Sequence, residues 1–118
     1  MIYIPQQYFT EKEMRCPCCQ RCEMEDDFME MLYAMRSFTP DIPYIVSSGY
    51  RCEAHNKDVG SCYRNHPEGR AVDIICYSSK TREILIIAAL KAGYKRIGIA
   101  KNMIHIDNMD ETPGMWLY

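Results

Sequence analysis

A charge inside an apolar segment constrains this chain more than any other feature of its sequence. Asp73 stands in the middle of residues 71–76, whose other members are apolar (AVDIIC). Such a run predicts a buried strand, and a carboxylate buried there is costly unless it is paired or bound to a metal ion. Alternation along a strand puts Ala71 and Ile75 on the same face as Asp73, and the small Ala71 leaves room beside the acid. We therefore expect a fold that brings partners to Asp73.

A second segment, residues 103–107 (MIHID), also combines apolar and chemically active side chains. Period-two geometry points His105 and Asp107 to one face of a strand, while Ile104 and Ile106 face the core. Two polar residues backed by two isoleucines predict one wall of a site.

His66 lies in a loop-like stretch ahead of Asp73, and Gly69 permits a sharp turn between them. Two histidines and one aspartate suit a catalytic zinc ion, which takes three protein ligands and keeps one position open. Taken singly, His66 could be an exposed loop residue and His105 a satisfied strand histidine. The chain has only 3 His, however, and two of them lie beside strand aspartates, which favours a metal site.

The rest of the chain predicts an α+β domain with a small, mostly antiparallel sheet and flanking helices. Apolar residues recur at helical spacing over residues 25–38, and a second helix is expected over residues 79–92, ended by Gly93. We expect Ile84, Ile87 and Ala88 on the buried face of that second helix. Residues 50–70 are expected to form a loop, and the expected strands are residues 42–47, 71–76, 96–100, 103–107 and, at an edge, 115–118.

Composition indicates one globular domain over residues 1–118, with a Cys-rich N-terminal segment over residues 1–25. Hydrophobic residues make up 47% and charged residues 25%, which excludes a disordered chain. A net charge of -2 argues against a nucleic-acid partner. The longest apolar run, residues 84–90, is too short to span a membrane, and no signal-peptide pattern is visible at the N-terminus. We expect neither a membrane nor a nucleic-acid partner.

The chain has 7 Cys, an odd number that argues against a complete disulfide framework. Four thiolates within one short segment could close a structural zinc site, although such sites ordinarily take two pairs from separate segments. One or two disulfides and free thiols are the alternatives, and Cys52 could pair with Cys62 under oxidising conditions. The candidate ligands of this second metal are Cys16, Cys18, Cys19 and Cys22.

Several of these segments together resemble the zinc D-Ala-D-Ala carboxypeptidase family, in the small single-domain form common in bacteriophages. The resemblance runs in order along the chain from about Phe9 to Tyr118, and it implies the hedgehog/DD-peptidase fold. The matching segments are Ser47-Ser48-Gly49-Tyr50-Arg51-Cys52, His55-Asn56, His66-x-x-Gly69-x-Ala71-x-Asp73, Ile104-His105-Ile106-Asp107 and Trp116.

The resemblance implies a zinc-dependent peptidase that acts on peptidoglycan stem peptides, as a D-Ala-D-Ala carboxypeptidase or as an endopeptidase. In that family a zinc-activated water attacks the peptide carbonyl. His66, Asp73 and His105 correspond to the zinc ligands. Arg51 corresponds to an arginine that binds the substrate or the developing oxyanion, which suits a fixed planar cation. Ser48, in the same segment, is a further candidate for substrate binding.

The chain departs from the family where a general base is expected. Other branches carry a carboxylate three residues before the last histidine ligand, and here that residue is Asn102, which cannot accept a proton. Asp107 is the expected substitute, either as general base or as the residue that orients a ligand. Glu68 is the other candidate for the base.

The departure at Asn102 keeps a second function open. The fold could persist as a weakly active or inactive module of a virion that retains its metal site and binds other virion proteins. For either function the resemblance implies a bacteriophage protein in the host cytoplasm or the virion, acting on the bacterial cell wall.

Overall fold

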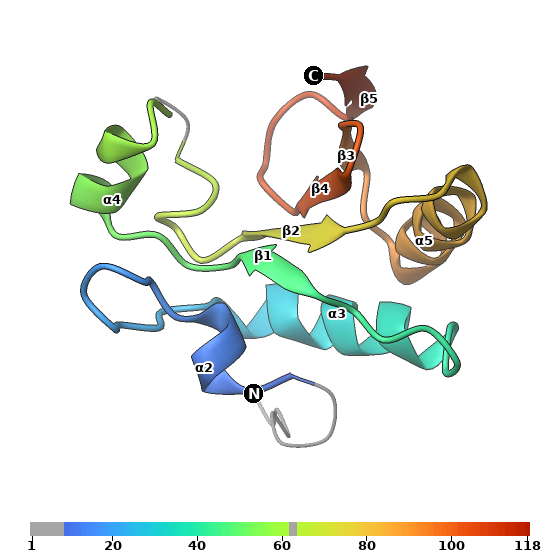
Figure 1. Ribbon diagram of the computed structural model, residues 1–118, viewed down its shortest axis with the longest axis horizontal. Coiled ribbons are helices and arrows are strands. Elements are labelled where there is room, and N and C mark those ends of the chain that lie inside the picture. Colours follow the sequence, from blue (N-terminus) through green and yellow to red (C-terminus); the bar gives the residue numbers. More distant parts are fainter. Residues whose placement is uncertain (1–8, 62–63) are drawn as a thin grey trace.

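The computed structural model describes residues 9–61 and 64–118, and it confirms the expected α+β class (Figure 1). Cys62, one of the residues for which a disulfide was considered, lies outside the described part. In chain order the elements are α2 (Glu11–Met14), α3 (Asp26–Ser37), β1 (Val46–Ser48), α4 (Glu53–Asp58), β2 (Ala71–Ile75), α5 (Ser79–Ala92), β3 (Arg96–Ile99), β4 (Met103–Asp107) and β5 (Gly114–Leu117).

The strands form one sheet in the order β1-β2-β4-β3-β5. All neighbouring pairs are antiparallel except β3 and β5, which run parallel. The register places Asp73 of β2 opposite His105 of β4, and it places Ala71 opposite Asp107. The two segments that the sequence marks as chemically active therefore lie side by side at the centre of the sheet.

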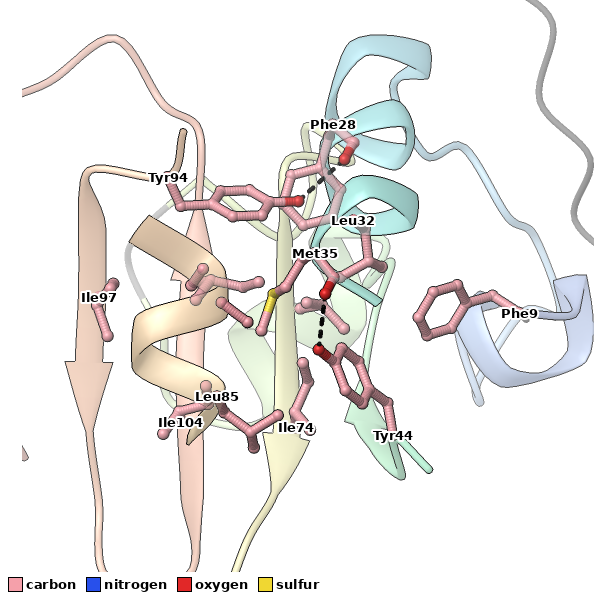
Figure 2. Packing of buried hydrophobic residues seen from close by; sticks show 14 of the residues in the cluster. Phe9, Phe28, Leu32, Met35, Tyr44, Ile74, Leu85, Tyr94, Ile97 and Ile104 are labelled. Atoms are coloured by element: carbon pink, nitrogen blue, oxygen red, sulfur yellow. Dashed lines mark hydrogen bonds between the residues drawn. The ribbon is translucent and has the colours of Figure 1, made fainter. Parts of the chain in front are cut away.

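Helices α3 and α5 pack on one face of the sheet and enclose the hydrophobic core with it (Figure 1). Ile104 and Ile106 are fully buried in that core, as their alternation with His105 and Asp107 predicts. Two tyrosine hydroxyls satisfy carbonyl groups of α3 there: Tyr94 donates to Phe28 at 3.0 Å and Tyr44 donates to Met35 at 3.3 Å (Figure 2). The polar side chains of β2 and β4 alternate with the apolar ones and therefore lie on the other face of the sheet.

Helix α5 spans the predicted residues, but a different face is buried. Leu85, Ala88 and Ala89 pack into the core, whereas Ile87 is 52% exposed. The expectation for Ile87 was wrong because residues 84–90 are apolar on all sides of the helix, so their spacing does not select one face. Within the part of the chain that the structure describes, no helix has the length and apolar character needed to span a membrane.

Three local features differ from the sequence prediction. The first strand, expected from residue 42, begins only at Val46; ahead of it, Pro43 has no N–H to offer a neighbouring strand, and the Ile45 carbonyl accepts a hydrogen bond from Ile75 at 2.8 Å. The expected loop contains α4, whose first turn is capped when the Cys52 sulfur accepts the amide of His55. The N-terminal segment contains α2, which begins at a capping box between Thr10 and Glu13.

Candidate metal centre

Three buried side chains from two strands and a loop meet on the polar face of the sheet. Asp73 projects from β2, His105 from β4, and His66 from the loop that precedes β2. One donor atom from each residue lies within 4.8 Å of the others. The structure thus brings together the three residues that the sequence proposes as metal ligands.

The imidazole of His66 is oriented by the backbone of another segment. Its Nδ1 lies 2.7 Å from the carbonyl oxygen of Gly49, so Nδ1–H donates and Nε2 carries the lone pair. That Nε2 faces the Asp73 carboxylate, with 3.5 Å between Nε2 and Oδ2. His66 can therefore offer Nε2 to an ion that Asp73 also binds.

His105 lies between two carboxylates and uses its nitrogens differently. Its Nε2 is 2.7 Å from Oδ2 of Asp107, and its Nδ1 is 2.8 Å from Oδ1 of Asp73. When Nε2–H donates to Asp107, the Nδ1 lone pair faces Asp73. Asp107 thus has the geometry of a carboxylate that fixes the tautomer of a metal-binding histidine.

Asp107 itself is fully buried and has both carboxylate oxygens engaged. Its Oδ1 accepts hydrogen bonds from Nε of Arg96 at 2.7 Å and from the amide of Met109 at 3.2 Å. Burial raises the pKa of Asp107, but the hydrogen bonds from His105 and Arg96 lower it more, so its pKa lies below the ordinary value. Asp107 is therefore an ionised, fixed acceptor.

The electrostatics of the centre favour a bound cation. Burial raises the pKa of Asp73, yet hydrogen bonds with His105 and His66 hold that pKa well below its usual range. Burial lowers the pKa of His105, but Asp107 and Asp73 outweigh it and the pKa is raised. A buried ionised carboxylate and two imidazoles, each with its outer nitrogen engaged elsewhere, fit the donor set of a zinc ion.

A cavity of about 320 Å³ opens beside these three residues. Arg51 lines it, as expected, and is half-buried there. Its Nε is buried, and no residue of the described ranges accepts a hydrogen bond from it. Burial lowers the pKa of the Arg51 guanidinium, and the nearby Asp73 carboxylate opposes that shift. Arg51 thus lines the cavity with a guanidinium whose Nε is left without a hydrogen-bond acceptor among the described residues.

The other expected residues lie outside this cavity. Ser48 lines a separate hollow with Lys12 and Gly49. Glu68 is exposed and pairs with Arg64, at 3.6 Å between Oε2 and Nε. Asn102 is exposed in the turn between β3 and β4.

Two residues that the sequence reasoning missed also line the cavity, Asn65 and Tyr118. Asn65 Nδ2 lies 3.4 Å from Nε2 of His105. Tyr118 has room because Gly98 lies beneath it, where an added Cβ would meet the Tyr118 ring at 2.7 Å. The sequence did offer a signal for Tyr118, because residues two apart on a strand share a face and Tyr118 follows Trp116 by two positions.

The cysteines gather in a set that differs from the expected one. Cys52, which follows Arg51 in the chain, joins the group, and Cys22 packs against the hydrophobic core instead. Burial raises the pKa of the Cys16 thiol, but backbone amides, chiefly that of Cys52, lower it to about 6. A hydrogen bond with Cys52 raises the pKa of Cys18 to about 12. The group consists of Cys16, Cys18, Cys19 and Cys52.

Comparison with known proteins gives a family match over most of the chain. The family model described as Peptidase M15 matches residues 7–107, a range that contains the three candidate ligands and Arg51. The curated proteins contain no match to this sequence.

Proposed function

This chain belongs to the peptidase M15 family of zinc-dependent metallopeptidases, and from that premise we propose that it hydrolyses peptidoglycan stem peptides with zinc held by His66, Asp73 and His105. The observation that carries the proposal is the convergence of these three side chains beside a cavity lined by Arg51. When bound there, zinc would activate water and polarise the scissile carbonyl. Resemblance to bacteriophage peptidases supports a setting in the host cytoplasm or the virion.

The outer hydrogen bonds of the two histidines support this assignment. Gly49 accepts from His66 and Asp107 accepts from His105, so each ring keeps one nitrogen for the ion. Of the two roles expected for Asp107, we propose the orienting one, because both of its oxygens already accept hydrogen bonds. Arg96 keeps that carboxylate ionised and fixed.

Arg51 supports a substrate with a free carboxylate. A half-buried guanidinium with an unpartnered Nε, next to the proposed metal, suits the C-terminal carboxylate of a D-Ala-D-Ala end. We therefore propose carboxypeptidase activity, with the cavity receiving the last residues of the stem peptide.

One observation favours the second candidate, a metal-binding module with little or no activity. Among residues 9–61 and 64–118, Asp73 is the only carboxylate that lines the cavity. Asn102 stands where related enzymes carry a carboxylate, and Glu68 pairs with Arg64 instead. A module of this kind would keep the fold and the zinc without turning over peptides.

The test is D-Ala release from a zinc-loaded protein incubated with a stem peptide that ends in D-Ala-D-Ala. We expect release from this peptide and much slower release from the same peptide amidated at its C-terminus, which removes the carboxylate for Arg51. His105→Ala should lose the zinc ion bound at His66 and Asp73, and its activity with it. If the zinc-loaded wild-type protein leaves all stem peptides intact, the proposed peptidase activity is wrong and the metal-binding module is favoured. Cleavage inside the stem peptide would show that the activity is that of an endopeptidase and not of a carboxypeptidase.

A further inference from the structure

We propose that Cys16, Cys18, Cys19 and Cys52 bind a second zinc ion, which has a structural role and is separate from the ion at His66. The four sulfur atoms lie within 4.8 Å of one another. Tetrahedral zinc with Zn–S bonds of ~2.3 Å sets its ligand sulfurs roughly 3.8 Å apart. A small contraction of the group therefore yields a closed four-sulfur site.

Two separate segments supply these ligands, three from one segment and one from the other. Three sulfurs come from one tight loop, in which the Cys16 amide donates to the Arg21 carbonyl at 2.7 Å and the Gln20 amide donates to the Cys16 carbonyl at 2.9 Å. Gln20 completes the turn with a φ of 66°. Cys52 comes from the segment between β1 and α4 and lies 3.3 Å from Cys18, sulfur to sulfur.

Backbone amides already point at the two buried sulfurs. The Cys52 amide donates to Sγ of Cys16 at 3.4 Å, and the His55 amide donates to Sγ of Cys52 at 3.4 Å. Such donors stabilise negative charge on sulfur, the state in which cysteine binds a metal. They also fix the direction of the sulfurs, as outer hydrogen bonds do in metal sites.

The hydrophobic cluster around these cysteines is small, so a metal crosslink would add stability there. Cys16, Tyr50 and Cys52 form a small cluster of their own, and among residues 9–61 and 64–118 Met24 is the one partly buried hydrophobic residue packed against it. The Tyr50 amide donates to the Met14 carbonyl at 2.7 Å, so the N-terminal loop lies against the segment that carries Arg51. A metal that joins the two segments supplies folding free energy that this small cluster lacks.

Zinc content and cobalt spectra of variants test the proposal. Protein purified under reducing conditions should contain two zinc ions per chain in the wild type and one in each of Cys19→Ser, Cys52→Ser and His66→Ala. Cys19 is exposed, so Cys19→Ser disturbs packing least. Cys22→Ser and Cys76→Ser are matched controls outside the group and should keep both ions.

Cobalt substitution separates this site from the proposed catalytic one. Thiolate-to-cobalt absorption should appear in the wild type and in His66→Ala, and it should vanish in Cys19→Ser and Cys52→Ser. Thiolate absorption absent from the wild type, or a Cys18–Cys52 disulfide in the reduced preparation, would overturn the proposal. Loss of the absorption in Cys22→Ser together with its retention in Cys52→Ser would also overturn the ligand set.

Discussion

Asp107 illustrates how a residue can matter to a metal centre without binding the metal. Its Oδ2 holds Nε2 of His105 at 2.7 Å, while Arg96 holds its other oxygen. Loss of such an outer carboxylate typically costs 10–100-fold in metal affinity. We therefore predict that Asp107→Asn weakens zinc binding at the His105 site by about that factor.

Competition with a chelator would measure this change in affinity. Asp110→Asn is the control, since Asp110 is exposed. Unchanged zinc affinity in Asp107→Asn would show that Asp107 does not orient His105.

Arg51 is expected to serve the substrate rather than the fold. Lysine keeps the charge but loses the planar fork of donors, and one lost charge-assisted hydrogen bond corresponds to roughly 10- to 100-fold in rate. We predict that Arg51→Lys lowers the rate of D-Ala release by about that factor with melting temperature and zinc content unchanged.

The control is Arg64→Lys, because Arg64 pairs with Glu53 and Glu68 outside the cavity. A large fall in the melting temperature of Arg51→Lys would instead make Arg51 a structural residue.

At the scale of elements, the loop that carries His66 is held by a close backbone contact. Gly69 has a φ of +71°, and a Cβ added there would meet the Glu23 carbonyl oxygen at 2.0 Å. Gly60 also has a positive φ, +82°, but has open space around it. Both alanine variants carry a strain of about 1–2 kcal/mol, and only Gly69→Ala adds the overlap.

We predict that Gly69→Ala lowers the free energy of unfolding by roughly 1–3 kcal/mol more than Gly60→Ala does. Urea titrations of the two variants would measure the difference. Equal losses would mean that the loop does not depend on its contact with residues 23–24.

The centre of the sheet could be predicted from the sequence because its signals are local. In β4, isoleucines alternate with His105 and Asp107, and alternation alone fixes which face each side chain takes. The buried face of α5 could not be predicted in this way, because its apolar run surrounds the helix. Cys52 joins three cysteines more than thirty positions earlier in the chain, a neighbourhood that only the tertiary fold creates.

At the scale of the whole molecule, stability should follow pH in opposite directions with and without zinc. The pKa of His105 is raised in the fold, since Asp107 and Asp73 outweigh burial. Without zinc, protonated His105 therefore stabilises the fold below its ordinary pKa of ~6.5, and this contribution is lost as the pH rises through the raised value. With zinc, protons compete for the ligands, so stabilisation by the metal grows as the pH rises.

His105→Gln isolates this effect. In chelator-treated protein, we predict that the stability advantage of the wild type over His105→Gln is larger near pH 6 than near pH 8. In zinc-saturated protein the stability advantage of the wild type should instead be larger near pH 8 than near pH 6. Calorimetry of both proteins at both pH values would measure it, and equal trends with and without zinc would contradict the assignment of His105 as a ligand.

Anomalous diffraction at the zinc absorption edge tests the central claim most directly. Crystals grown with zinc should show a peak at bonding distance, ~2.0–2.1 Å, from Nε2 of His66 and Nδ1 of His105, and within reach of the Asp73 carboxylate. Crystals supplied with zinc that show no peak among these three residues would contradict the account.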